Sequence, residues 1–154
     1  MLNPFWSTRG SGGVVTHPYI NPLTMQNVVQ KYVDIPFIFP HFGAGYWQEL
    51  LHLAWSSPNV YVDSSGSNDW VRWMPYKLSL ENLFEKAYET IGPERMIFGT
   101  DSCRFPRGFS KRYLDIQEVA CNNIGMSKKD MQLFFGGNAA RILKLEDALP
   151  VKVL

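Results

Sequence analysis

Three short apolar runs, at residues 35–39, 60–62 and 95–100, predict buried β-strands. The runs are continuous and do not alternate with polar residues, which is typical of strands covered on both faces in a parallel sheet. A shorter run at residues 14–16 predicts a further strand that ends at His17.

The stretches between and after these runs carry apolar residues at helical spacing. The clearest begins after Ser79, a predicted N-cap, and its apolar residues recur every three or four positions as far as Ile91. Ser127 and Asp130 form a second predicted capping pair, and Asn138 is predicted to cap a terminal turn. The predicted helices cover residues 22–33, 46–57, 80–91, 111–124 and 127 onward.

Strands and helices therefore alternate along the chain, with roughly 24 to 36 residues in each unit, as in parallel βα repeats. Long irregular segments follow the carboxyl ends of the strands, which is the asymmetry of an α/β active-site face. We predict one α/β domain over residues 1–154, with a loop at 1–13, βα units at 14–110 and C-terminal helices at 111–145.

The composition excludes several classes of protein. Of the 154 residues, 45% are hydrophobic and 19% are charged, and the net charge of +1 offers no basic surface for nucleic acid. No apolar run approaches the ~20 residues that span a bilayer, and no signal-peptide pattern opens the chain, so no membrane contact is expected. Cys103 and Cys121 lack CxxC spacing, which argues against a disulfide scaffold and favours a cytoplasmic location.

Two chemically capable residues, His41 and Asp101, each follow an apolar strand and precede an irregular loop. Because the carboxyl ends of parallel strands share one rim, we expect the two side chains to meet in space. An imidazole and a carboxylate at such a rim suit acid–base catalysis or a divalent metal. For each residue a structural role has the same weight as the functional one: Asp101 would cap a turn, and His41 would be a hydrogen-bonded structural histidine.

Other polar residues are weaker candidates. His17 follows too short a strand to favour a ligand over a structural role, and His52 lies within a helix without a partner at i+4. Asp63 ends the middle strand, but its Ser- and Gly-rich surroundings also suit a turn former. Arg104 and Arg107 follow Asp101 and would either bind a substrate carboxylate or face solvent.

Four segments in order carry a resemblance to a known family: FPHFGAG at 39–45, PNVYVDSS at 58–65, ERMIFGTD at 94–101 and GNAARIL at 137–143. Together they are similar to the second half of the amidohydrolase-related family, which includes aminocarboxymuconate semialdehyde decarboxylase and resorcylate-type decarboxylases. The resemblance runs from about residue 21 to residue 145. It implies a partial (β/α)₈ TIM-type barrel that contains roughly strands 5/6 to 8 with their helices.

The family places a metal ion at the carboxyl rim, held by a His-x-His pair on the first strand, a histidine after the fifth and an aspartate after the eighth. By position, Asp101 resembles the eighth-strand metal ligand, and His41 resembles the sixth-strand histidine that binds the ion or moves a proton. His17 is the candidate for the fifth-strand ligand, unless that ligand lies upstream of Met1. The resemblance implies zinc, or else manganese, which lowers the pKa of water toward ~7 and polarises the reacting group.

This chain departs from the family because it has no His-x-His and only three histidines. We therefore expect a fragment with an incomplete metal site, covered by the missing barrel half or by a homo-oligomer. The first hypothesis is a metal-dependent hydrolase or decarboxylase that acts on a small carboxylate-bearing substrate, with Arg104 and Arg107 as substrate-binding residues. The alternative is an inactive remnant that serves as a binding module. A nucleotide-binding domain is disfavoured because no Gly-rich phosphate loop follows a first strand.

Overall fold

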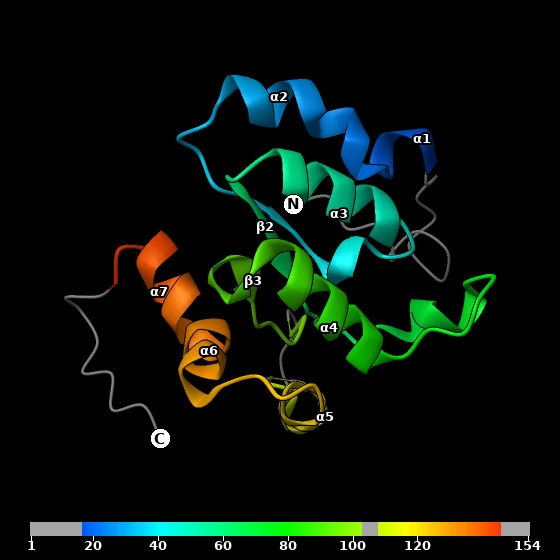
Figure 1. The fold of residues 1–154 in the computed structure, drawn as a ribbon, viewed down its shortest axis with the longest axis vertical. Helices are drawn as coiled ribbons and strands as arrows, with labels where there is room; N and C mark the ends of the chain where they lie inside the picture. The colour runs from blue at the N-terminus through cyan, green and yellow to red at the C-terminus, as the bar shows by residue number, and fades with distance from the viewer. Residues whose placement is uncertain (1–16, 103–107, 146–154) are drawn as a thin grey trace.

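A three-stranded parallel sheet forms the centre of the computed structural model, which describes residues 17–102 and 108–145. Strands β1 (Phe37–Phe39), β2 (Val60–Asp63) and β3 (Met96–Ile97) follow one another in the order β1-β2-β3 (Figure 1). Phe37 pairs with Val60, and Val62 pairs with Met96. The predicted parallel α/β architecture is confirmed.

The helices lie between and after the strands, close to their predicted places. In Figure 1, α3 and α4 lie across the same side of the sheet, and α5 to α7 follow β3 along the chain. The α-helices are α1 (His17–Ile20), α2 (Gln26–Lys31), α3 (Trp47–Ser56), α4 (Leu80–Ile91), α5 (Lys111–Asn123), α6 (Lys128–Gln132) and α7 (Asn138–Ile142). Short 3₁₀ turns span Pro22–Met25, His41–Gly43, Asp69–Trp73 and Pro93–Arg95, and a π-turn spans Leu133–Gly137.

Two of the predicted caps are confirmed, and a third prediction is wrong. The hydroxyl of Ser79 accepts the Asn82 N–H to form a capping box, and Ser127 accepts the N–H of Asp130. Asn138 does not cap α7, because it has helical dihedral angles and is fully buried. Its side-chain amide instead donates to backbone carbonyls beside β3. His17 is the first residue of α1, so the prediction that it ends a strand is also wrong, and residues 14–16 lie outside the described part of the chain.

The sheet has one face covered by helices and one face more open. Phe37, Val60, Val62 and Met96 belong to the covered face and pack into the hydrophobic core. Ile38, one position along β1, is 41% exposed. Burial of β1 on both faces was therefore a wrong prediction, because α3 and α4 cover only one side of the strand.

Two further expectations fail for local reasons. Trp55, predicted in a mostly buried helix, is 77% exposed on the outer side of α3. Strand β3 ends at Ile97 instead of continuing to residue 100. The next amide, that of Phe98, donates to the carbonyl of Phe134 at 3.1 Å, so the chain leaves the sheet to pair with the π-turn.

Three polar side chains fix the amino ends of the strands. Asn59, Arg95 and Asn138 each donate to backbone carbonyls from two or more places in the chain. Buried amides and guanidinium groups that satisfy several carbonyls hold elements in register. These residues belong to the segments at 58–65, 94–101 and 137–143, so part of each recognised motif serves the scaffold. The backbone carbonyls that accept these hydrogen bonds are those of Val29, Tyr32 and Ile35 for Asn59; Ala54, Ser57, Val60 and Ile91 for Arg95; and Pro93 and Met96 for Asn138. Chemically capable side chains lie instead at the carboxyl ends of the same strands.

Candidate functional site

His41 lies in a tight turn directly after β1. All five residues from 41 to 45 have positive φ, including 58° at His41, 48° at Phe42 and 50° at Ala44. Left-handed backbone at non-glycine residues costs about 1–3 kcal/mol each and persists only where the surroundings impose it. Here Phe42 is fully buried between Trp47 and Phe84, at ring distances of 5.5 and 5.2 Å, and this packing fixes the turn. The turn holds His41 at the carboxyl end of the sheet with only 5% of its surface exposed.

Asp101 follows β3 and is also in the left-handed region, with φ of 57°, but its side chain is exposed. Gly66, in the loop after β2, lies between His41 and Asp101. A Cβ atom at Gly66 would be 3.2 Å from Nδ1 of His41 and 3.9 Å from Cβ of Asp101. One methyl group would thus contact both side chains. The side chains of His41 and Asp101, sixty positions apart in the sequence, thus both approach Gly66.

The imidazole of His41 is held by the loop after β2. Its Nδ1 lies 2.9 Å from the carbonyl oxygen of Ser65 and 3.0 Å from the Ser65 hydroxyl. A carbonyl oxygen only accepts hydrogen bonds, so a hydrogen bond at this contact places the proton on Nδ1, and the Ser65 hydroxyl is then an acceptor too. In the neutral ring of this tautomer the lone pair is on Nε2, and a nitrogen lone pair is what accepts a proton or binds a metal. The alternative prediction of a hydrogen-bonded histidine is confirmed, and it is compatible with a chemical role.

Asp63, at the end of β2, is a third carboxyl-end residue near the same point. Its carboxylate accepts the Ser65 N–H, which confirms the predicted turn-forming role. Burial raises the pKa of Asp63; hydrogen bonds from Ser65 and the charge of His41 oppose this shift, and the charge of Asp101 adds to it. Asp63 thus shares its electrostatic surroundings with both predicted site residues. Reasoning from the sequence missed this, although its place after an apolar strand matches those of His41 and Asp101.

The raised pKa of Asp63 predicts a pH-dependent stability. A carboxyl whose pKa is higher in the folded chain adds stability below its unfolded pKa of about 4, and this contribution is lost as pH rises through the folded pKa. Asp63→Asn is therefore expected to increase the free energy of unfolding at pH 7, and the gain should vanish below pH ~4. Urea unfolding across pH measures this. Asp34→Asn, at an exposed position, is the control, and a gain at Asp63 that does not change with pH would contradict the assignment.

The remaining predicted site residues are not brought to this point by the described structure. The His17 side chain, Cys103, Arg104 and Arg107 lie outside the described residues, so their predicted roles stay predictions. His52 is exposed on α3, in agreement with its structural or solvent-facing assignment.

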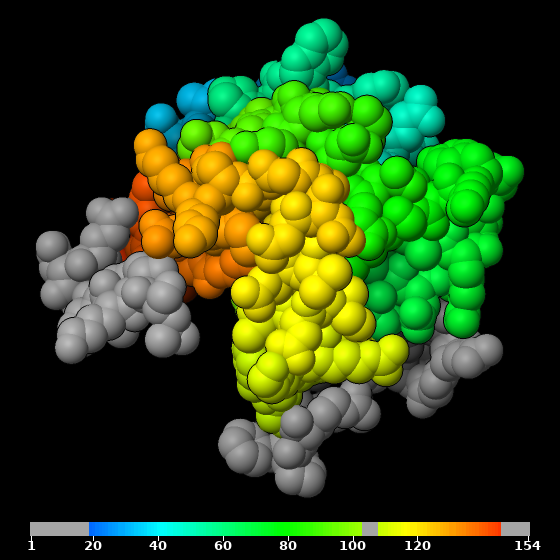
Figure 2. All heavy atoms as spheres, turned by 60° about the horizontal axis from the view of Figure 1, so that its bottom comes forward, coloured from blue at the N-terminus to red at the C-terminus, as the bar shows by residue number. Residues whose placement is uncertain are grey.

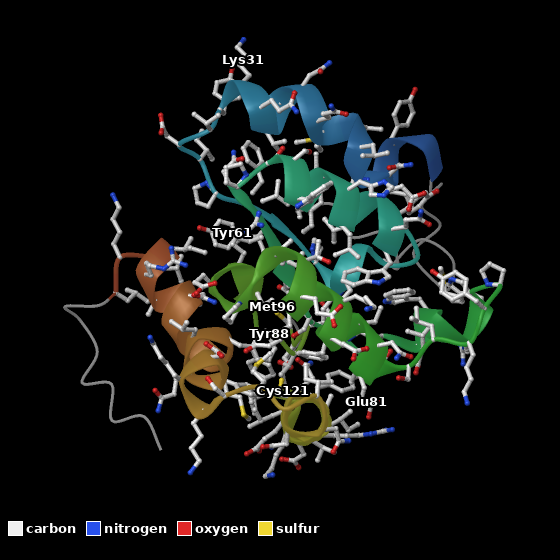
Figure 3. All side chains as sticks on the ribbon, in the orientation of Figure 1. Lys31, Tyr61, Glu81, Tyr88, Met96 and Cys121 are labelled. Atoms are coloured by element: carbon white, nitrogen blue, oxygen red, sulfur yellow. The ribbon has the colours of Figure 1, made fainter. Side chains whose placement is uncertain are left out.

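The second cysteine offers no nucleophile. Cys121 of α5, labelled in Figure 3, is fully buried, and burial raises the pKa of its thiol to about 12. A thiol with so high a pKa stays protonated at neutral pH.

The metal site expected from the sequence is not complete among the described side chains. Within residues 17–102 and 108–145, no group of three or more His, Cys, Asp or Glu is arranged to hold an ion. Asp101 offers one exposed carboxylate, but structural and catalytic zinc sites require at least three protein ligands. The described residues alone therefore do not fit a bound metal, and further ligands would have to come from outside them.

A cavity of about 120 Å³ lies beside Gly66, between the loop after β2 and the first turns of α5. Its polar lining includes Asp69, Arg112, Tyr113 and Gln117. Helix α5 protrudes from the body of the molecule in Figure 2, where it is yellow. Arg112 was not singled out from the sequence, because a lone arginine at the start of a helix carries no signal of its own.

Solved structures with the same fold define the architecture as part of a TIM barrel. An amidohydrolase from Burkholderia multivorans, crystallised with bound zinc, superposes with a TM-score of 0.64 at 21% identity, over 86% of this chain and 51% of that one. An uncharacterised TIM-barrel protein from Bordetella bronchiseptica gives a TM-score of 0.62 at 25% identity, over 88% of this chain and 43% of that one. The chain spans about half the length of these proteins.

Sequence comparison then gives the family. The protein fluG of Emericella nidulans is 28% identical over 89 residues, which are 58% of this chain and 10% of that protein. The sequence profile of the amidohydrolase family matches residues 13–145. The chain belongs to the amidohydrolase family, and the resemblance found in its four segments is confirmed. No helix in the described ranges has the length and hydropathy needed to cross a membrane.

Proposed function

We propose that His41 and Asp101 form one side of the active site of a metal-dependent hydrolase or decarboxylase. The observation that supports this is their common contact point at Gly66, at the carboxyl ends of parallel strands. In TIM-barrel enzymes the active site is formed at this end of the strands by residues from several of them. Family membership supports the hydrolase class, and decarboxylation is the second reaction considered.

In this proposal His41 moves a proton at Nε2, because its Nδ1 hydrogen is engaged by the Ser65 carbonyl. Asp101, which is exposed, either contributes a ligand to a divalent ion or accepts a proton. Zinc is the first choice of ion and manganese the second. His17, or residues from outside the described part of the chain, would supply the ligands that the described side chains lack.

The substrate in this proposal is a small molecule with a carboxylate. Arg104 and Arg107 remain the predicted anion-binding residues, and Arg112 adds a guanidinium in the cavity beside Gly66. A guanidinium pairs with a carboxylate through two parallel hydrogen bonds. We place the reaction in the cytoplasm, as the cysteine usage favours.

The proposal also requires a source for the other barrel strands. The structure describes three parallel strands, whereas a closed barrel has eight. A missing barrel half or a second copy of the chain would then cover the more open face of the sheet, where Ile38 is exposed.

One observation favours a second function. Because no three-ligand group exists among the described residues, the chain would also be consistent with an inactive scaffold that binds a partner or a small molecule. Such a scaffold would not need Asp101 for metal binding.

Zinc binding by the purified chain separates the two functions. Equilibrium dialysis with elemental analysis is expected to show zinc bound by the unmodified chain. In Asp101→Ala the affinity should fall at least about tenfold, because a ligand is lost. Asp115→Ala is the matched control, since this carboxylate is exposed on α5, where it pairs with Lys111. No binding, or equal binding by both variants, would favour the inactive scaffold.

A further inference from the structure

We propose that Asp63 is a positioning residue for His41, acting through Ser65. The inference rests on the proposed function for its catalytic meaning, but the contacts that carry it are independent of any metal or substrate. They form a continuous chain from the end of β2 to the imidazole after β1.

The first contact fixes the backbone after β2. The Asp63 carboxylate accepts the N–H of Ser65, two residues further on, which makes a turn of the kind that aspartate favours. This hydrogen bond holds the peptide group between Ser64 and Ser65. The Ser65 side chain also hydrogen-bonds to the Asp63 carboxylate, so Asp63 holds Ser65 at two atoms.

The second contact joins Ser65 to the imidazole ring of His41. The Ser65 carbonyl accepts the Nδ1 hydrogen of His41 at 2.9 Å, and the Ser65 hydroxyl lies 3.0 Å from the same nitrogen. With the proton held on Nδ1, the neutral ring has its lone pair on Nε2. A proton-transfer role for His41 thus depends on how the carbonyl and hydroxyl of Ser65 are held.

The surroundings leave Ser65 little room to move. A Cβ at Gly99, two residues after β3, would be 2.9 Å from Cβ of Ser65 and 3.1 Å from Oδ1 of Asp63, so only a glycine fits against this turn. A Cβ at Gly66 would be 3.2 Å from Nδ1 of His41. The chain is packed closely on both sides of the Ser65 peptide.

The preceding residue is anchored from α5. The Ser64 hydroxyl donates to Oε1 of Gln117, and the Ser64 carbonyl accepts from Nε2 of Gln117 at 3.3 Å and from Nδ2 of Asn68 at 2.9 Å. Gln117 is fully buried. The Ser64 carbonyl and the Ser65 N–H belong to one peptide group, which Gln117 and Asn68 hold at its oxygen and Asp63 holds at its N–H.

The raised pKa of Asp63 agrees with this arrangement, because burial of the carboxyl is its largest cause. An aspartate needed only for a surface turn would keep its carboxylate in water. Here a half-buried carboxyl is retained at a position where His41 and Asp101 both act on it electrostatically.

The test is the tautomer of His41, read by ¹⁵N NMR of histidine-labelled chain at a pH where free imidazole is neutral. The chain has three histidines, so its signals are assigned with His17→Gln and His52→Gln. We expect the Nδ1–H form at His41 in the unmodified chain. Asp63→Ala should shift the tautomer ratio toward Nε2–H by about fivefold, the worth of one net hydrogen bond.

The matched variant is Asp63→Asn, whose side-chain oxygen still accepts the Ser65 N–H, and it should keep the Nδ1–H form. Asp69→Ala, in the same loop but exposed, should also leave the tautomer unchanged. If Asp63→Ala does not fold, Asp63→Leu fills the same volume without an acceptor and replaces it. An unchanged tautomer in the alanine or leucine variant, or the same shift in the asparagine variant, would overturn the proposal.

This readout separates the inference from the proposed function. Suppose that the His41 tautomer changes in Asp63→Ala but that zinc affinity does not change in Asp101→Ala: the positioning role would stand and the metal-dependent reaction would be contradicted. If zinc affinity falls in Asp101→Ala and the tautomer is unchanged in Asp63→Ala, the metal-dependent reaction would stand and the positioning role would be contradicted.

Discussion

Replacing His41 by glutamine is expected to lower turnover by about 10²–10⁴-fold, the range that general acid–base groups contribute. Glutamine keeps a hydrogen-bond donor near the Ser65 carbonyl but cannot take up a proton at neutral pH. The loss should appear in kcat more than in KM, because a proton-transfer group acts in the transition state. Turnover is measured with the barrel completed as the proposal requires, on a panel of small aromatic carboxylates and their esters and amides.

His52→Gln is the matched control, since His52 is a histidine exposed on α3. It should leave turnover within about twofold of the unmodified chain, as surface substitutions usually do. Equal activity in the two variants would remove His41 from the reaction. A chain without turnover on any member of the panel would favour the inactive scaffold.

Replacing Phe84 by alanine is expected to destabilise the fold by about 3–5 kcal/mol, the usual range for a buried phenylalanine. Phe84 of α4 is fully buried and lies between Phe42 and Phe134, at ring distances of 5.2 and 5.3 Å in edge-to-face geometry. Since domains are stable by only about 5–15 kcal/mol, this change removes a large share of the total. Phe42 also belongs to the turn that holds His41, so the empty space left by the Phe84 ring should make that turn less rigid.

Guanidinium chloride unfolding, followed by circular dichroism, measures the loss. Phe109→Ala is the control, because this ring is 61% exposed and should change stability by less than about 1 kcal/mol. Similar losses in the two variants would show that the aromatic cluster of Phe42, Phe84 and Phe134 is not the centre of the core.

Helices with strong local signals were predictable from the sequence. Helix α4 follows its apolar spacing and its Ser79 cap from Leu80 to Ile91, because both signals act within a few residues. Ser127 caps α6 for the same reason. The order of parallel strands was also predictable, since it depends on the alternation of strand and helix.

Features that depend on distant neighbours were not predictable. Ile38 belongs to an apolar run, but its exposure depends on which elements lie over β1. Strand β3 ends early because Phe98 pairs with Phe134, thirty-six positions away. The approach of His41 and Asp101 followed from strand order, whereas the part played by Asp63 follows from a turn that points its carboxylate back into the same region.

The most direct test of the shared site is anomalous diffraction at the zinc edge from crystals of the chain grown with zinc. If the proposed ligand role of Asp101 is right, the anomalous peak would lie beside its carboxylate. Electron density that puts His41 and Asp101 on separate surfaces, or zinc bound only to other side chains, would contradict the account.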